Sequence, residues 1–259
     1  MAHTIYDNFV LENKIENLLT TNIDLNNYMT IDYSLTENAG MKKIINTYTA
    51  TGDVQDLKMG EGNTDEITVS FTPKEYTVGV TQGHFAYYDE QEMTDPMVVD
   101  TGLQALSQKM TNDLTTKAIK AMGEATLTIE NFAFTFDGVV DAIAKYPYED
   151  EDGLFLLINP AQKAKVRKNL GLELKYSEGF ARTGYIGTVC GVPVIVSKAV
   201  PEGEAYLATK DAVTCFVKKG SEVEQDRDAD VRKNDVWARK VMVIALTDAT
   251  KIVKLIAAA

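Results

Sequence analysis

The chain has 259 residues, of which 45% are hydrophobic, and a formal net charge of −12 at pH 7. A chain of this length buries about 75% of its unfolded surface, so we expect a soluble globular protein of one elaborate domain or two small ones. The acidic balance argues against a nucleic-acid reader and against adhesion to anionic membranes. No apolar run is long enough to span a membrane. The N-terminus lacks a secretory signal, which predicts synthesis in the cytoplasm.

In the first forty residues, a predicted helix and a predicted strand are separated by a polar stretch. The apolar spacing over Tyr6–Thr20 suits a short amphipathic helix. A polar stretch, Thr21–Asn27, follows it, and Tyr28–Leu35 is typical of a short strand. Asn38-Ala39-Gly40 then marks a break in the chain.

A β-hairpin is predicted next. Met41–Thr51 is expected to be its outgoing strand, and Ile67, Val69 and Phe71 alternate along the return strand. Gly52-Asp53 and Gly60–Asn63 supply turn residues, and Pro73 favours a sheet edge. The arm Ile44–Asp65 contains few apolar residues, yet a hairpin needs a hydrophobic face packed on something. We therefore expect a neighbouring subunit to cover it, which indicates assembly rather than catalysis.

One long helix is predicted over Pro96–Ala125. Thr94 or Asp95 can cap it, Pro96 suits its first turn, and Gly123 suits its end. A core-facing stripe has helical spacing and comprises Val99, Leu103, Leu106, Met110, Leu114, Ala118 and Met122. An acidic group precedes the helix and comprises Asp89, Glu90, Glu92 and Asp95. These carboxylates could serve as acid–base groups, but they are better explained by attraction to the helix N-terminus.

The remainder is expected to be mixed helix and strand. A helix is predicted over Phe136–Tyr146, with Val139, Val140, Ile143 and Ala144 facing inward. Gly153–Asn159 is typical of a buried strand, and Pro160–Leu170 of a short helix. The further strands expected are a pair within Tyr185–Val200 that bends near Gly191, then Ala205–Leu207 and Val213–Val217. Val236–Leu246 and Ala249–Ile256 are predicted to form a closing hairpin with Thr247-Asp248 at its turn.

No pattern of catalytic or metal-binding residues emerges. The acidic run Glu149–Asp152 could be half of a metal site, although it lacks the spacing of a calcium loop and suits a solvated loop better. A basic group on the Pro160–Leu170 helix could contact phosphate, or carboxylates of a neighbour, or solvent; it comprises Lys163, Lys165, Arg167 and Lys168. His3 and His84 lack partners at ligand spacing, and Cys190 and Cys215 suit buried free thiols. We expect no enzyme, no cofactor and no catalytic, cofactor-binding or metal site.

Four segments together resemble the major capsid proteins of tailed double-stranded-DNA bacteriophages, which have the α+β HK97 fold. They are FTPKEYTVGVTQGHFAYYDEQEMTDP (Phe71–Pro96), the long helix Pro96–Ala125, LFLLINPAQKAKVRKNL (Leu154–Leu170) and IGTVCGVPVIVSKAVPEGEAYLATKDAV (Ile186–Val213). The C-terminal VMVIALTDATKIVKL also suits the strands that close the family's peripheral domain. The order and spacing of these segments cover about four-fifths of the chain.

The resemblance implies a role for each part of the chain. Residues 1–27 would be an N-terminal arm, 44–75 an extended β-hairpin loop, and 126–222 an axial domain. The peripheral domain would comprise 28–43, 76–125 with a long spine helix, and 223–259. Many relatives begin with a scaffolding segment that is cut off, and there is no room for one before the N-terminal arm. The resemblance therefore implies a separate scaffolding protein, which the initial Met favours, or else a sequence that is already mature; it also implies a portal protein. Some relatives cross-link through a lysine of the extended loop; Lys58 lies there, but no partner matches.

The resemblance implies a structural function. Many copies would form pentamers and hexamers and close an icosahedral shell around double-stranded DNA, without sequence-specific binding and without a membrane. The protein would be assembled in the host cytoplasm and reside in the virion capsid. The first alternative is an encapsulin-like nanocompartment shell around a cargo enzyme. The second is an α/β enzyme, for which the sequence supplies no nucleophile–base pair.

Overall fold

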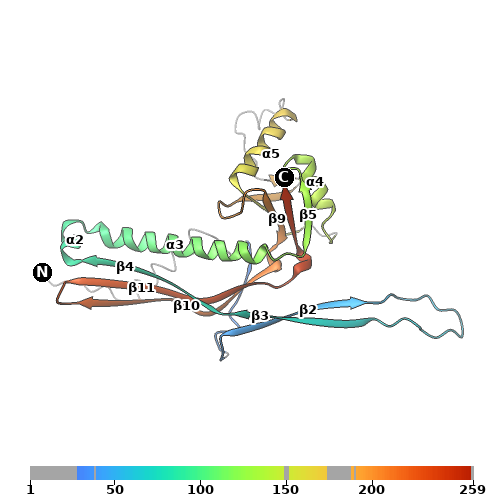
Figure 1. Ribbon diagram of the computed structural model, residues 1–259, viewed down its shortest axis with the longest axis horizontal. Helices are drawn as coiled ribbons and strands as arrows, with labels where there is room; N and C mark the ends of the chain where they lie inside the picture. The colour runs from blue at the N-terminus through green and yellow to red at the C-terminus, as the bar shows by residue number, and fades with distance from the viewer. Residues whose placement is uncertain (1–27, 38, 149–151, 174–187, 190, 258–259) are drawn as a thin grey trace.

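The computed structural model describes residues 28–37, 39–148, 152–173, 188–189 and 191–257. In chain order its elements are β1 (Thr30–Asp32), β2 (Lys42–Thr51), β3 (Thr68–Thr77), β4 (Gly79–Tyr88), α2 (Asp89–Thr94), α3 (Met97–Met122), β5 (Leu127–Phe132), α4 (Phe136–Ala144), β6 (Leu154–Ile158), α5 (Pro160–Glu173), β7 (Thr188–Val189), β8 (Val192–Val196), β9 (Glu204–Thr209), η2 (Lys210–Ala212), β10 (Val213–Asp228), β11 (Lys233–Leu246), η3 (Ala249–Lys251) and β12 (Ile252–Ala257). They form two lobes and a projecting ribbon (Figure 1). The helix expected over Tyr6–Thr20 lies outside the described residues.

The first lobe, which we call the α3 lobe, is a four-stranded sheet covered by one long helix. Its strand order is β1-β10-β11-β4, and α3 runs along one face of the sheet (Figure 1). Two glycines allow this close approach. A Cβ at Gly83 of β4 would lie 2.2 Å from the Leu106 side chain, and one at Gly102 of α3 would lie 2.2 Å from the Phe85 ring. The helix and the sheet therefore interlock where these side chains are missing.

The predicted long helix is confirmed as α3. All seven stripe residues are buried, from Val99 to Met122. The Asp95 carboxylate accepts a hydrogen bond from the backbone N of Met97 at 2.9 Å, as a residue that opens a helix does. At the other end, the backbone N of Gly123 donates to the carbonyl of Ile119 at 2.9 Å. The stripe is a core face, as its spacing predicts.

The second lobe, the six-stranded lobe, carries the strand order β5-β12-β9-β6-β8-β7. Every residue of β6 is buried, which confirms the predicted buried strand. The helix α4 begins at Thr135, whose hydroxyl accepts from the backbone N of Gly138 at 3.1 Å. Its inward face differs from the prediction, because Val140 and Ala144 are exposed while Ala142 is buried with Val139 and Ile143. Val140 follows Val139 by one residue, so its side chain is turned by about 100° around the helix axis and does not reach the core that covers Val139.

The predicted closing hairpin is wrong. β11 pairs with β10 and β4, whereas β12 pairs with β5 and β9 in the other sheet. Between them, the backbone N atoms of Thr247 and Asp248 both donate to the carbonyl of Ala212, which directs the chain across to the second lobe. There Ile252, Val253 and Leu255 are all buried, as in a strand covered on both faces. β10 is also longer than predicted and continues to Asp228.

A shared core joins the two lobes. The C-terminal half of α3 contributes Leu114, Ala118 and Met122 to a cluster that also contains Tyr206 and Ile252 of the six-stranded lobe. The body is therefore continuous, and the ribbon β2–β3 is the one part of the described residues that projects far from it (Figure 1). No helix of the described residues is both long and apolar enough to cross a membrane.

Candidate assembly surfaces

The projecting ribbon, which we call the arm, consists of β2, β3 and the loop between them, residues 42–77. The strands pair antiparallel from Lys42 opposite Thr77 to Thr51 opposite Thr68. This confirms the predicted hairpin. Gly52 has φ 118° and a Cβ there would lie 2.5 Å from the Glu66 carbonyl, so the turn requires glycine at this position. Because the arm has only two strands, one edge of each strand has no neighbouring strand to pair with. Pro73 was expected to lie at such an edge, since proline cannot donate a backbone hydrogen bond.

The strand register gives the arm two chemically different faces. Side chains of opposed residues share a face and alternate along each strand. One face, the apolar face, carries Ile44, Tyr48, Ala50, Val69, Phe71 and Pro73. The other, the hydroxyl face, carries Thr47, Thr49, Thr51, Thr68, Ser70 and Thr72. Tyr48 and Phe71 lie directly opposite each other with ring centroids 6.2 Å apart, and they are 66% and 62% exposed.

The body covers the opposite side of the arm at its base. Ile45 and Tyr76, which follow the register of the hydroxyl face, pack against a cluster that includes Val78 and Phe216. The Lys43 ammonium lies 4.5 Å above the Phe216 ring. The apolar face is therefore the face turned away from the subunit at the point of attachment. Covering it requires another molecule.

The loop at the end of the arm is acidic. Residues 52–67 contain five carboxylates, Asp53, Asp56, Glu61, Asp65 and Glu66, with Lys58 as the single cation. The Gln55 carboxamide holds the loop closed by accepting from the backbone N of Thr64 at 3.0 Å. Val54, Leu57 and Met59 are exposed. A loop that carries both charged and exposed apolar side chains suits the rim of a protein–protein contact.

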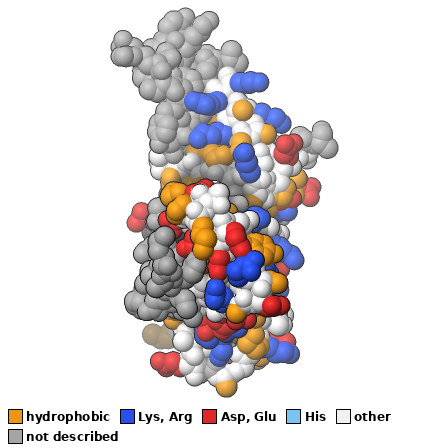
Figure 2. All heavy atoms as spheres, turned by 90° about the vertical axis from the view of Figure 1, so that its left-hand side faces the viewer, with side chains coloured by type: hydrophobic (Ala, Val, Ile, Leu, Met, Phe, Trp, Pro, Cys, Tyr) orange, Lys and Arg blue, Asp and Glu red, His pale blue; other side chains and the backbone are white. Residues whose placement is uncertain are grey.

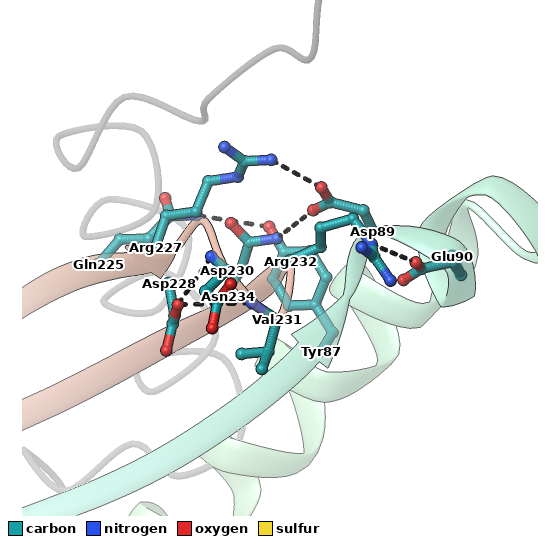
Figure 3. A network of polar contacts seen from close by, with 10 residues as sticks. All are labelled: Tyr87, Asp89, Glu90, Gln225, Arg227, Asp228, Asp230, Val231, Arg232 and Asn234. Carbon is teal, nitrogen blue, oxygen red and sulfur yellow. Dashed lines mark hydrogen bonds and ion pairs between the residues drawn. The ribbon is translucent and has the colours of Figure 1, made fainter.

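The end of the α3 lobe is closed by a polar network between α2 and the β10–β11 turn (Figure 3). Asp89 is only 4% exposed and accepts hydrogen bonds from Arg227 Nη2 and Asn234 Nδ2, both at 2.7 Å. Beside it, the Arg232 guanidinium donates to Glu90 and lowers the pKa of that carboxyl. These carboxylates join α2 to the turn, so they have a structural role rather than an acid–base role.

This network refines one prediction about the acidic group. Asp89, Glu90 and Glu92 lie in the first turn of the short helix α2, not beside the N-terminus of the long helix. Of the four carboxylates, Asp95 is the one that binds the backbone of α3. The sequence placed the charges near a helix start, but it did not reveal that a second, shorter helix intervenes.

Among the described residues, the remaining candidates include one histidine and one cysteine. His84 lies within β4, where its Nε2 is 2.6 Å from Asp235 Oδ1 and its ring stacks on Trp237. Cys215 is buried, and burial raises the pKa of its thiol to about 11, so the reactive thiolate is scarce. No group of metal ligands occurs among the described residues. His3, Cys190 and residues 149–151 of the acidic run lie outside them.

One hollow of about 250 Å³ lies where the arm meets α3 and β11. Its charged lining includes Lys117, Lys120 and Glu124. Glu124 is bound by Lys74 at 2.6 Å, and Lys117 by Asp113. The described lining contains no serine, cysteine or histidine that could act as a nucleophile with a base.

Comparison with known proteins identifies the family. Residues 72–255 match the model of a family described as phage capsid protein. The chain belongs to this phage capsid protein family. It is 28% identical over 155 residues to the major capsid protein of Staphylococcus phage phiMR11, a match that covers 58% of this chain and 55% of that protein. The chain thus spans about half the length of that curated relative.

Solved structures of phage capsids share the fold. The capsid of Ralstonia phage GP4 matches with a TM-score of 0.66 and 9% identity, covering 89% of this chain and 87% of that chain. A virus-like particle from Pyrococcus furiosus matches with a TM-score of 0.65 and 12% identity, covering 95% and 98%. Identities this low establish likeness of fold alone. The mixed helix-and-strand fold of this phage capsid family member is HK97-like, as the resemblance predicts.

Sequence reasoning missed the two-faced character of the arm. It treated Ile44–Asp65 as poor in apolar residues and did not notice that Ile44, Tyr48 and Ala50 alternate with polar residues along the first strand. The signal was present in the run Thr47-Tyr48-Thr49-Ala50-Thr51, which alternates between hydroxyl and apolar side chains. Recognising it required the register, because only the pairing shows that Phe71 and Val69 share a face with Tyr48 and Ala50.

Proposed function

We propose that this phage capsid family member is a major capsid protein whose copies form pentamers and hexamers and close an icosahedral shell around packaged double-stranded DNA. The observation that carries the proposal is the exposed apolar face of the arm. At the base, its own body packs on the other face, so the apolar face is available to a neighbouring copy. Contacts between two different surfaces of identical copies build closed rings when the rotation between copies closes.

The lobes take corresponding roles in this proposal. Residues 44–75 act as the extended loop, and residues 1–27 as an N-terminal arm. The α3 lobe acts as the peripheral domain with α3 as its spine helix, and the six-stranded lobe acts as the axial domain. Two strands differ from the expected boundaries of the axial domain, 126–222, and of the C-terminal part of the peripheral domain, 223–259. β10 joins the four-stranded sheet from Val213 onward, and β12 belongs with the six-stranded sheet.

The proposal also covers partners and location. We include a separate scaffolding protein and a portal protein as partners during assembly in the host cytoplasm, with the virion capsid as the final location. The net charge of −12 supports a shell that encloses DNA without binding it tightly or by sequence. Membership of a capsid family supports a structural role over an enzymatic one.

The experiment compares the two faces of the arm. The double variant Tyr48→Ser/Phe71→Ser removes two rings from the apolar face, and Thr47→Ala/Thr72→Ala is the matched control on the hydroxyl face one residue away. Electron micrographs of purified wild type should show rings or shells. The first variant should lose them and the control should keep them. Equal loss in both variants, or normal shells in the first, would contradict the proposal.

A compartment shell is the second candidate. The structure of a virus-like particle from Pyrococcus furiosus matches nearly the whole length of this chain and of its own chain. This match supports a compartment shell as the second candidate. The contents of purified particles distinguish the two functions. Nuclease-protected double-stranded DNA supports the phage capsid, whereas a copurifying cargo protein without DNA supports an encapsulin-like compartment.

A further inference from the structure

Opposite charges are separated on two helices of the six-stranded lobe. The basic surface follows α5, whose first turns carry Lys163, Lys165, Arg167 and Lys168. Figure 2 shows Lys and Arg side chains gathered over this lobe. We call these four residues the basic face.

The lysines of the basic face have no ion-pair partner among the described residues of their own subunit. Lys163 lies in the first turn of α5, where a cation opposes the helix macrodipole and where no acidic residue occurs. Among the described residues, no carboxylate forms a salt bridge with Lys163, Lys165 or Lys168. Such a face in a chain of charge −12 suits an anionic partner.

The acidic counterpart lies on α4. Asp137 and Asp141, four residues apart on this helix, are both exposed. Within the described residues no cation forms a salt bridge with either carboxylate. Val140 of the same helix is an exposed apolar side chain, and so is Leu127 of β5, whose neighbour Ile129 packs with the core under α4. We call Asp137 and Asp141, with these two apolar residues, the acidic face.

We propose that the basic face of one copy binds the acidic face of the next copy around each ring. This inference rests on the proposed function, and it names which surfaces of the six-stranded lobe meet. The two faces lie on different elements, with α4 on the right of the lobe and α5 at its upper left in Figure 1. A contact between two different faces is heterologous, so each copy can use both and the chain of contacts can close into a ring.

The same cations could instead contact the phosphates of enclosed DNA. The acidic face argues for the protein partner. DNA would leave Asp137 and Asp141 unpaired and Val140 exposed, whereas a second copy pairs the charges and covers the apolar side chain. Ala161 and Ala164 are small, exposed residues next to the lysines of α5, so a neighbouring helix can approach closely. Complementary charges of this kind set register and partner choice.

Charge reversal tests the pairing. Lys165→Glu/Lys168→Glu and Asp137→Lys/Asp141→Lys should each reduce the yield of rings and shells roughly tenfold or more, because like charges would face each other across the contact. The combination of all four substitutions should restore assembly. Lys165→Arg/Lys168→Arg keeps the charge and should assemble normally. These side chains are exposed, so the circular-dichroism melt should stay close to that of the wild type in every variant.

The salt dependence of the wild type provides a second readout that requires no variant. Assembly should weaken as ionic strength rises, because partly exposed ion pairs are screened. Normal shells from either reversed variant, or no rescue in the combined variant, would overturn the inference while leaving the capsid function intact. Normal shells that fail to retain DNA in Lys165→Glu/Lys168→Glu would assign the basic face to nucleic acid. A wild type that forms no rings at all would overturn the capsid proposal itself.

Discussion

The helix α3 and the arm use apolar side chains in opposite ways. Leu103 and Met110 of α3 are 1% and 3% exposed, because the four-stranded sheet of the same chain covers them. Tyr48 and Phe71 of the arm have a comparable size and remain largely exposed. Full burial of one such side chain stabilises by about 1.5–3 kcal/mol, less the cost of ordering it and, between subunits, of association. In α3 this energy stabilises the subunit, and in the arm it is available to the assembly.

Deleting part of the arm should have the largest effect on assembly. We expect a variant that lacks Thr51–Thr64, closed by a short Gly linker, to fold normally and to form no stable shells. The deleted segment contributes only exposed large apolar residues, Val54, Leu57 and Met59, so the subunit core is unchanged. The measurement combines a circular-dichroism melt with electron microscopy. Normal shells from this variant would show that the arm is dispensable.

Leu106→Ala should have the largest effect on the subunit. Leu106 is buried against β4, beside Gly83, and its truncation removes buried surface and leaves a cavity. We expect the free energy of unfolding to fall by about 2–5 kcal/mol, with a lower melting temperature. Gln108→Ala, at an exposed position of the same helix, is the control and should change stability little. If both variants melt alike, α3 does not carry the core that we describe.

Gly102→Ala should change the free energy of unfolding by a smaller amount. The sign of that change shows whether the packing of the helix on the sheet or the helix propensity of alanine dominates. Alanine in place of glycine within a helix usually stabilises by about 1 kcal/mol. Here the added Cβ would lie 2.2 Å from the Phe85 ring, so the ring, the helix or the strand must shift. We expect a loss of about 1–3 kcal/mol in a denaturant titration. A gain in stability would mean that α3 and β4 pack more loosely than the structure shows.

The smallest expected effect concerns pH. Hydrogen bonds from Arg239 and Lys219 hold the pKa of Glu222 at about 2. Because the folded pKa is depressed, this carboxylate contributes its stabilisation fully above the ordinary glutamate pKa and loses it as pH falls toward about 2. Glu222→Gln should therefore destabilise by less than about 1 kcal/mol at neutral pH and by nothing at the acid end. A constant difference between the two melting curves across this pH range would contradict the assignment.

Local patterns predicted the elements that one chain segment determines by itself. The stripe of α3, the apolar run of β6 and the glycines of the arm loop each reflect spacing or composition within one segment. The pairing of distant strands was not predicted. Val236–Leu246 and Ala249–Ile256 looked like a hairpin because two apolar runs flank Thr247-Asp248. Their separation depends on Ala212, whose carbonyl binds both turn residues and is far away in sequence.

The basic face, the acidic face and the apolar face of the arm were predictable only where one chain segment determines them. The basic group on α5 is visible in the sequence because its lysines are neighbours. Its acidic counterpart is not, because the exposure of Val140 beside Asp137 and Asp141 depends on which face of α4 packs inward. The apolar face of the arm likewise requires the register of β2 with β3. Long-range pairing decides which side chains share a surface.

Electron cryomicroscopy of the purified wild-type protein tests most directly the claim that the apolar face of the arm is buried between copies. We predict rings or closed shells in which Tyr48 and Phe71 lie against a neighbouring copy and the hydroxyl face with Thr47 and Thr72 faces solvent. A monomer at high concentration with an ordered arm would contradict the account. Shells in which the Tyr48 and Phe71 rings remain exposed to solvent would contradict it as well.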